Sequence, residues 1–269
     1  MDALFDHHPP EGEPLPLVVS IPHSGTFVPL EIARGFAGPE IEALPDTDFH
    51  LERLYDFASA LGAEVLVART SRYVVDLNRP RDGAPLYPGR AETEVVPTRS
   101  FAGAPIWRPG REPDQKEREE RLGAFWDPYH RELRRILERL RERHGYALLF
   151  DAHSIRGEVP RLVQGRLPDL MLGSAGGRSC DPRIRDAVRE VLENGGYDFR
   201  LDDPFRGGYI TRGYGRPSEG VHALQLEMSQ RIYMEEDPPW TYREDRAAAL
   251  RPLLRRALET FAAEARAHL

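Results

Sequence analysis

The chain has 269 residues, of which 40% are hydrophobic, and a formal net charge of −7. This length suits one α/β domain with a large core, since such domains often run to about 250 residues. The acidic balance argues against a nucleic-acid partner, and no apolar run approaches the ~18 residues of a membrane span. Cys180 is the single cysteine, so no internal disulfide can form, and residues 1–16 lack the basic start and apolar centre of a signal peptide. We therefore expect a cytoplasmic protein.

Apolar periodicity predicts the elements in chain order. Strands are expected over residues 17–21, 64–70 and 73–77, from residue 146 onward, and over 169–173 and 222–229. Helices are expected within 29–44, from 51 to a stop at Gly62, over 115–144 with a kink at Pro128, and over 181–194 and 242–269. No internal repeat or linker interrupts this order, so residues 1–269 are interpreted as a single domain. Strands that alternate with helices predict a three-layer α/β fold, with a mainly parallel sheet between helices.

Two irregular segments lie between these elements. Residues 80–114 are rich in proline and glycine and have little periodicity, which is typical of a lid or pocket wall. Residues 207–215 form a glycine-rich stretch that we expect to be a loop. It lacks the strand-turn-helix setting of a phosphate-binding loop.

Polar side chains stand where predicted strands end. His23 follows the first strand, and Asp151 and His153 lie at the carboxyl end of the strand that begins at residue 146. Ligands and catalytic groups gather at such ends in α/β sheets. Because successive side chains of a strand point to opposite faces, Gln225 and Glu227 share one face of the last strand, and its leucines lie on the other. A polar face on so apolar a strand suggests a site.

These residue types suit a hydrolytic metal site. Zinc in hydrolases is typically held by three ligands from His, Asp and Glu, and it lowers the pKa of a bound water to about 7. His23 and His153 can supply two ligands, and Asp46 or Asp48 the third, although we also expect one of this pair to cap the following helix. Each residue alone also fits a purely structural role.

The other roles at such a site also have candidates. Glu227 is the candidate general base. Asp151 can orient a ligand histidine through its second ring nitrogen, with Gln225 as further support. Arg72, Arg79 and Arg212 are candidates for binding substrate carboxylates, because a guanidinium forms two parallel hydrogen bonds with a carboxylate. A serine-nucleophile elbow and a His-Glu-x-x-His helix are both absent from the sequence.

Several ordered motifs extend this pattern over nearly the whole chain. They are Ile21-Pro22-His23-Ser24-Gly25, Pro45-Asp46-Thr47-Asp48-Phe49-His50, Val75-Asp76-Leu77-Asn78-Arg79-Pro80, Asp151-Ala152-His153-Ser154, Gly207 to Gly215, and Gln225-Leu226-Glu227-Met228. Together they resemble the N-formylglutamate amidohydrolase family of histidine degradation. The resemblance implies a fold similar to zinc carboxypeptidase-type exopeptidases and the hydrolysis of N-formyl-L-glutamate to formate and L-glutamate.

The resemblance also implies roles for individual residues. His23 and His153 look like zinc ligands, Glu227 like the general base, and Asn78 with Arg79 like the pair that holds a substrate carboxylate. Carboxypeptidases place a carboxylate ligand three residues after the first histidine, but Thr26 stands there in this chain. We prefer Asp48 as the third ligand, because Asp46 is expected to cap the helix.

Some alternatives stay open at this point. Another divalent metal in place of zinc, another N-acyl amino acid or short peptide as the substrate, and a metal-free module that binds carboxylates all remain compatible with the sequence. The oligomeric state is not indicated.

Overall fold

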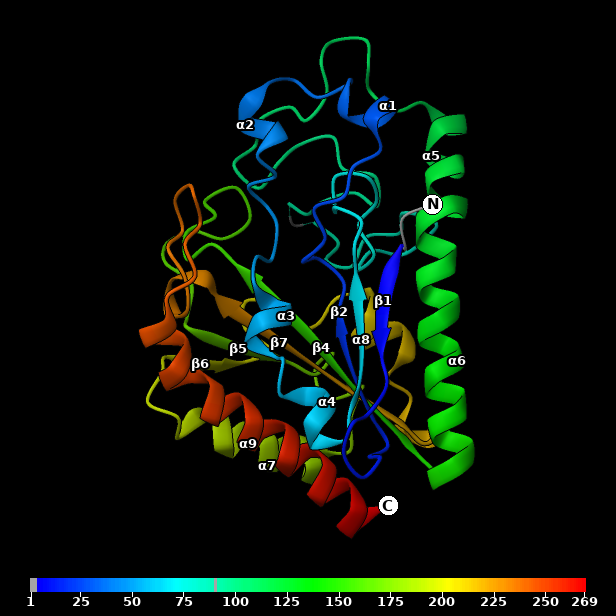
Figure 1. The fold of residues 1–269 in the computed structure, drawn as a ribbon, viewed down its shortest axis with the longest axis vertical. Coiled ribbons are helices and arrows are strands. Elements are labelled where there is room, and N and C mark those ends of the chain that lie inside the picture. The colour runs from blue at the N-terminus through cyan, green and yellow to red at the C-terminus, as the bar shows by residue number, and fades with distance from the viewer. Residues whose placement is uncertain (1–3, 90) are drawn as a thin grey trace.

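Within residues 4–89 and 91–269, which the computed structural model describes, seven strands form one sheet in the order β1-β3-β2-β4-β7-β5-β6 (Figure 1). The strands are β1 (Phe5–His8), β2 (Leu17–Ile21), β3 (Glu64–Ala68), β4 (Ala147–Ile155), β5 (Leu170–Gly173), β6 (Phe199–Leu201) and β7 (Val221–Ser229). The β1–β3 and β5–β7 pairs are antiparallel, and the other pairs are parallel. The predicted α/β class with a mainly parallel, mixed sheet is confirmed.

The α-helices are α1 (Leu30–Ala33), α2 (Pro39–Glu42), α3 (Leu51–Leu54), α4 (Ala58–Leu61), α5 (Gln115–Arg121), α6 (Asp127–His144), α7 (Pro182–Glu193), α8 (Tyr209–Tyr214) and α9 (Glu244–His268). A π-helical turn, η1 (Leu122–Trp126), joins α5 to α6, and η2 (Pro217–Glu219) and η3 (Gln230–Ile232) are 3-10 turns. The long helix α6 lies along one face of the sheet, and α7 and α9 lie along the other (Figure 1). In the described part of the chain, no helix is both long and apolar enough to cross a bilayer.

The central strand β4 shows why this sheet places polar groups where it does. All nine of its residues are buried. Leu148 and Phe150 pack in the core beneath α7 and α9, whereas Leu149 packs in the core beneath α6, because successive side chains point to opposite faces. Fully burying one such apolar side chain contributes about 1.5–3 kcal/mol. Asp151 and His153, which lie nearer the carboxyl end of β4, point to the same face of the sheet as Leu149, the face that α6 covers.

Two predicted elements are wrong. Residues 73–77 are buried but form turns rather than a strand, with the Val74 N–H bonded to the Ser71 carbonyl and the Asp76 N–H to the Val95 carbonyl. Their apolar character reflects burial, and a buried turn that follows β3 can be as apolar as a strand. The glycine-rich stretch 207–215 is not wholly a loop, because helix α8 occupies most of it.

Other boundaries differ in detail. The helix predicted from residue 51 to Gly62 is two separate helices, α3 and α4, and neither Asp46 nor Asp48 caps it. The residue before α3 is His50, which has a left-handed φ of 64° and makes no side-chain capping bond. The helix predicted over 115–144 is continuous, and the π-helical turn η1 ends at Trp126, shortly before Pro128, which cannot donate a backbone hydrogen bond within the helix. Strands β1 and β6 were not predicted, and residues 1–3 of the N-terminal stretch lie outside the described residues.

Candidate active site

Three predicted ligand residues meet at the end of the sheet. His23 follows β2, Asp48 lies in the turn before α3, and His153 belongs to β4. His153 Nδ1 is 3.2 Å and His23 Nδ1 is 3.8 Å from the same Asp48 oxygen, Oδ2, and one ligand atom from each residue lies within 4.8 Å of the others. All three side chains are buried.

Asp46 does not join this group. Its Oδ2 instead accepts hydrogen bonds from the Tyr73 hydroxyl at 2.7 Å and from the Phe101 N–H at 2.8 Å. Asp46 therefore fastens the irregular segment 80–114 to the turn that follows β3. The reason for preferring Asp48, a capping role for Asp46, was wrong, although Asp48 is the carboxylate that the structure places beside the two histidines.

The donor set fits a divalent metal. His23 Nδ1 is buried without a hydrogen-bond partner among the described residues, and such orphaned polar atoms are uncommon in protein interiors. The other ring nitrogen of each histidine faces a carboxylate, with His23 Nε2 2.8 Å from Asp76 Oδ1 and His153 Nε2 2.9 Å from Asp151 Oδ2. These carboxylates favour a proton on Nε2, and Nδ1 of each ring faces Asp48, which is the side from which a metal would be bound.

The strands beside β4 and the turn that contains Asn78 carry the supporting residues. Ser20 of β2 donates a hydrogen bond to Asp151 Oδ1 at 3.0 Å, and Asn78 Nδ2 donates to Asp151 Oδ2 at 3.2 Å. On the other side, Gln225 of β7 pairs in register with Asp151, and Glu227 pairs with His153. The predicted shared face of Gln225 and Glu227 is confirmed.

Gln225 joins the two sides of the site. Its Oε1 accepts hydrogen bonds from the Gly208 N–H at 2.8 Å and from Asn78 Nδ2 at 3.3 Å. Its Nε2 lies 3.5 Å from Glu227 Oε2. Asn78 in turn accepts the Ile210 N–H on its side-chain oxygen at 2.8 Å, so the start of α8 is held to the same network.

Burial and neighbouring charges shift the pKa values of these groups. Burial, together with the charge of Arg72, lowers the pKa of His23 despite the opposing influence of Asp76. Burial also acts to lower the pKa of His153, but the charge and hydrogen bond of Asp151 outweigh it and raise that pKa well above 6.5. Burial acts to raise the pKa of Asp48, yet Arg72 and the two histidines lower it, so Asp48 is held as a carboxylate.

The pKa of Glu227 is shifted in the opposite direction from that of Asp48. Its side chain is only partly exposed, and burial, reinforced by the charges of Asp48 and Asp151, raises its pKa to about 8. His153 and Arg72 act in the other direction but do not cancel that rise. A carboxyl group with a pKa near neutrality can both accept and release a proton under ordinary conditions.

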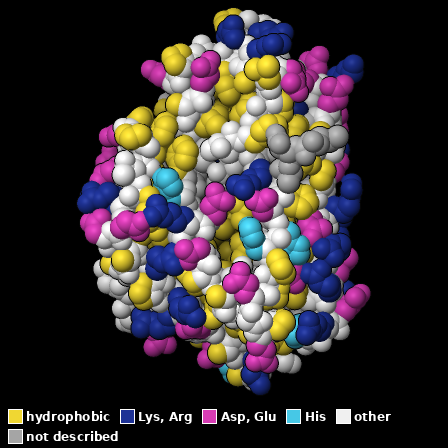
Figure 2. All heavy atoms as spheres, in the orientation of Figure 1, with side chains coloured by type: hydrophobic (Ala, Val, Ile, Leu, Met, Phe, Trp, Pro, Cys, Tyr) yellow, Lys and Arg dark blue, Asp and Glu magenta, His cyan; other side chains and the backbone are white. Residues whose placement is uncertain are grey.

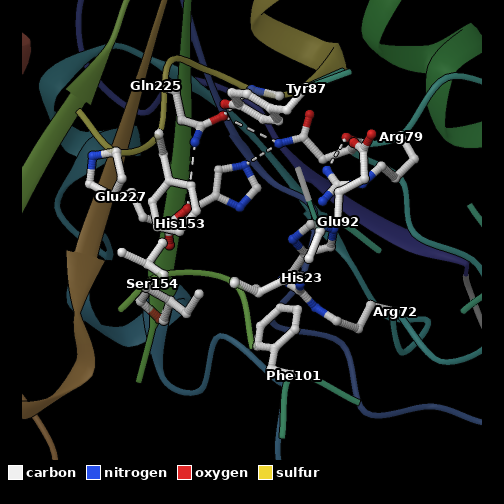
Figure 3. Close-up of a pocket in the computed structure, with 18 residues that line it drawn as sticks. His23, Arg72, Arg79, Tyr87, Glu92, Phe101, His153, Ser154, Gln225 and Glu227 are labelled. Atoms are coloured by element: carbon white, nitrogen blue, oxygen red, sulfur yellow. Dashed lines mark hydrogen bonds between the residues drawn. The ribbon is translucent and has the colours of Figure 1, made fainter. Parts of the chain in front are cut away.

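A small cavity opens above these groups (Figure 3). Its volume is about 90 Å³. The close-up shows Glu227, Gln225 and His153 on one side, with His23 and Arg72 across from them. The irregular segment 80–114 completes the wall with residues that include Tyr87, Glu92 and Phe101.

The predicted arginines occupy three different positions. Arg72 is buried, with Nη2 2.7 Å from Asp48 Oδ1 and its guanidinium 4.9 Å from the centre of the Phe101 ring. Arg79 lines the cavity and donates hydrogen bonds to the Thr93 and Asn78 carbonyls. Arg212 is not among the residues that line this cavity but belongs to a neighbouring hollow.

Sequence reasoning missed three contributors to the site. Asp76 holds His23, Phe101 covers Arg72, and the Ser154 N–H donates to Asp48 Oδ2 at 3.1 Å. Asp76 left a usable signal, because it is an acidic residue within the apolar run 73–77, and a buried carboxylate requires a partner. Phe101 and the Ser154 backbone left none, since their roles depend on contacts between distant segments.

Comparison with known proteins gives a consistent picture. The N-formylglutamate amidohydrolase family model matches residues 15–234. An N-formylglutamate deformylase of Pseudomonas putida is 47% identical over 264 residues, which cover 98% of this chain and 97% of that protein. Another of that name from Pseudomonas aeruginosa is 48% identical over 250 residues, 93% of each chain.

A solved structure agrees with the sequence comparison. The N-formylglutamate amidohydrolase from Ralstonia eutropha JMP134 superposes with a TM-score of 0.85 at 27% identity, covering 99% of this chain and 100% of that one. The predicted likeness to zinc carboxypeptidases stays a prediction. The family match over residues 15–234 and the near full-length relatives lead to one conclusion: this chain belongs to the N-formylglutamate amidohydrolase family.

Proposed function

We propose that this chain hydrolyses the formyl amide of N-formyl-L-glutamate to formate and L-glutamate, as the last step of histidine degradation in the cytoplasm. The observation that carries the proposal is the convergence of His23, Asp48 and His153 beside a cavity that His23, His153 and Glu227 line. The names of the Pseudomonas relatives, which match almost end to end, support the choice of substrate.

We assign the three converging residues to zinc or another divalent metal. When bound there, such an ion would lower the pKa of a water molecule and polarise the formyl carbonyl. Asp76 and Asp151 keep each histidine in the tautomer that presents Nδ1. The Ser154 N–H and Arg72 hold the Asp48 carboxylate in place.

Glu227 transfers the proton that the reaction requires. It accepts a proton from the attacking water and delivers it to the amide nitrogen as the carbon–nitrogen bond breaks, so that glutamate leaves as a free amine. Its raised pKa, about 8, suits both halves of this transfer. Gln225, which lies 3.5 Å away, restricts where the carboxyl group can point.

The two carboxylates of the glutamate moiety require cationic partners. Arg72 and Arg79 supply them in the cavity, with Asn78 beside them. Arg212 acts from outside the cavity by holding the Leu86 and Gly207 carbonyls at its rim. The cavity volume of about 90 Å³ favours a formyl group over bulkier acyl groups.

The test is the release of glutamate from N-formylglutamate by the purified, metal-loaded protein. Glu227→Gln should lower kcat by about 10²- to 10⁴-fold, the usual contribution of a general acid–base, while metal content measured by elemental analysis stays unchanged. Glu219→Gln, on the exposed turn η2, is the matched control and should retain full activity. A fully active Glu227→Gln variant would show that another group is the base.

A second comparison tests the choice of substrate. Rates on N-formylglutamate, N-acetylglutamate and N-formylaspartate should fall in that order, because the cavity is small and its arginines are fixed. A preference for the acetyl compound, or activity on short peptides alone, would assign the same site to a different N-acyl substrate.

A further inference from the structure

A second hollow lies beside the candidate active site and shares Tyr87 with it. Pro204, Phe205 and Gly208 line the first cavity, whereas Arg206, which lies between them in the chain, lines the second. The second hollow has a volume of about 230 Å³. Its wall carries three arginines, Arg178, Arg206 and Arg212, and no carboxylate.

This hollow differs from four other hollows of the molecule, each of which has at least one acidic residue in its lining. Acidic and basic side chains are interspersed on the face shown in Figure 2. Many arginines have an acidic partner, such as Arg255 with Glu259. Among the described residues, no acidic group lies within 4.0 Å of the guanidinium of Arg178, Arg206 or Arg212. The chain carries a net charge of −7, so an excess of basic residues does not account for three uncompensated cations around one hollow.

One of these cations is already fixed in position. Arg212 Nε donates to the Gly207 carbonyl and Nη1 to the Leu86 carbonyl, each at 2.7 Å. Its guanidinium lies 4.5 Å from the centre of the Tyr87 ring. A guanidinium held in this way loses little conformational freedom when it binds a ligand.

Tyr87 connects the hollow to the active-site cavity. Its hydroxyl accepts a hydrogen bond from the Arg206 N–H at 2.9 Å and lies 3.3 Å from the Gly207 carbonyl. The next residue, Gly208, donates its N–H to Gln225. A ligand that draws the three arginines together would therefore act on a wall that both hollows share.

We propose that this hollow is a binding site for a doubly charged oxyanion, either free phosphate or a small dicarboxylate. We also propose that binding of this anion changes substrate binding in the adjacent active-site cavity. Guanidinium groups bind phosphate and carboxylate oxygens through paired, charge-assisted hydrogen bonds, which gives three arginines a ligand of this chemistry. The binding step is independent of the proposed function, whereas the effect on substrate binding rests on it.

The binding step is tested by calorimetric titration of the metal-loaded protein with phosphate and, separately, with glutarate at low ionic strength. We expect saturable binding that weakens by about tenfold or more in Arg178→Gln and in Arg206→Gln, since each removes one charge-assisted contact. Arg255→Gln, which removes an exposed arginine of α9, is the control and should bind like the parent protein. The stronger of the two ligands identifies the source of the oxyanion.

Two results would overturn the site itself. One is the absence of saturable binding of either anion in the millimolar range. The other is binding that Arg178→Gln and Arg206→Gln both retain in full, which would place the anion elsewhere, for example at the metal ligands.

The coupling is tested separately by kinetics. The stronger anion should shift KM for N-formylglutamate in the parent protein and lose that effect in Arg178→Gln. An identical shift in both proteins would refute the coupling while leaving the binding result intact. If the protein failed to hydrolyse N-formylglutamate at all, the calorimetric result would still decide whether the oxyanion site exists.

Discussion

Asp76 is the residue whose replacement best tests how the proposed metal ligands are held. Its Oδ1 lies 2.8 Å from His23 Nε2 and also accepts the Asn78 N–H at 2.9 Å. Burial acts to raise its pKa, but the charges of His23, Arg79 and Arg72 lower it, so Asp76 is a carboxylate. It therefore supplies both a hydrogen-bond acceptor and a negative charge to a histidine whose other ring nitrogen faces Asp48 at the proposed metal site.

These two contributions can be separated. Asp76→Asn keeps an oxygen acceptor and removes the charge, whereas Asp76→Ala removes both and leaves His23 Nε2 buried without its partner. Loss of a group that orients a metal-binding histidine weakens metal affinity by about 10–100-fold. We expect the asparagine variant near the lower end and the alanine variant near the upper end, which corresponds to about 1.4 and 2.7 kcal/mol.

The assay is a competition titration of metal-free protein with zinc and a chromophoric chelator. Asp46→Asn is the matched control, because Asp46 is also buried and hydrogen-bonded but contacts neither histidine. It should bind zinc like the parent protein. Circular dichroism should confirm that each variant is folded. Unchanged zinc affinity in folded Asp76→Ala would refute the role assigned to Asp76.

Two further predictions concern the core. Burial lowers the pKa of His130 to about 3, below the ~6.5 of an unfolded chain. The unfolded state therefore takes up a proton that the folded state does not, and stability falls as pH drops below ~6.5, by about 1.4 kcal/mol per pH unit for this residue. The stability difference between the parent and His130→Gln, from urea denaturation, should accordingly shrink by about 2 kcal/mol between pH 7 and pH 5; a difference that does not change with pH would contradict the buried, neutral histidine. Cys180, just before α7, is 1% exposed, and burial raises its pKa to about 12. A thiol reagent should therefore label it only after denaturation. Rapid labelling of the native protein would contradict this and show that α7 opens readily.

The central part of the candidate site could be predicted because it depends on the spacing of residues that are close together in the sequence. Alternation along a strand depends only on sequence spacing, so Asp151 and His153 on one strand and Gln225 and Glu227 on another could each be assigned to a common face. The register then sets Asp151 beside Gln225 and His153 beside Glu227. Their separation in the chain did not matter, because parallel strands align their carboxyl ends.

The errors arose where local sequence has no unique structural meaning. The apolar run 73–77 has the composition of a strand, but its backbone bonds to Ser71 and Val95 rather than to a neighbouring strand. The glycine-rich stretch 207–215 becomes helical at α8 because Asn78 accepts the N–H groups of Tyr209 and Ile210 at the start of that helix. The bond to Ser71 is local, but the other partners, Val95 for the first stretch and Asn78 for the second, lie outside the segment whose structure they help to decide.

The sequence by itself determined the alternating α/β pattern and the chemical types gathered at the strand ends. Only the tertiary structure decided between Asp46 and Asp48, since the two stand two residues apart and differ in which segments they meet: Asp46 bonds Tyr73 and Phe101, and Asp48 faces both histidines. It also paired Asp76 with His23 and placed Arg212 in the neighbouring hollow. Strand periodicity is a property of adjacent residues, whereas the position of a turn or a loop side chain follows from long-range packing that no local pattern records.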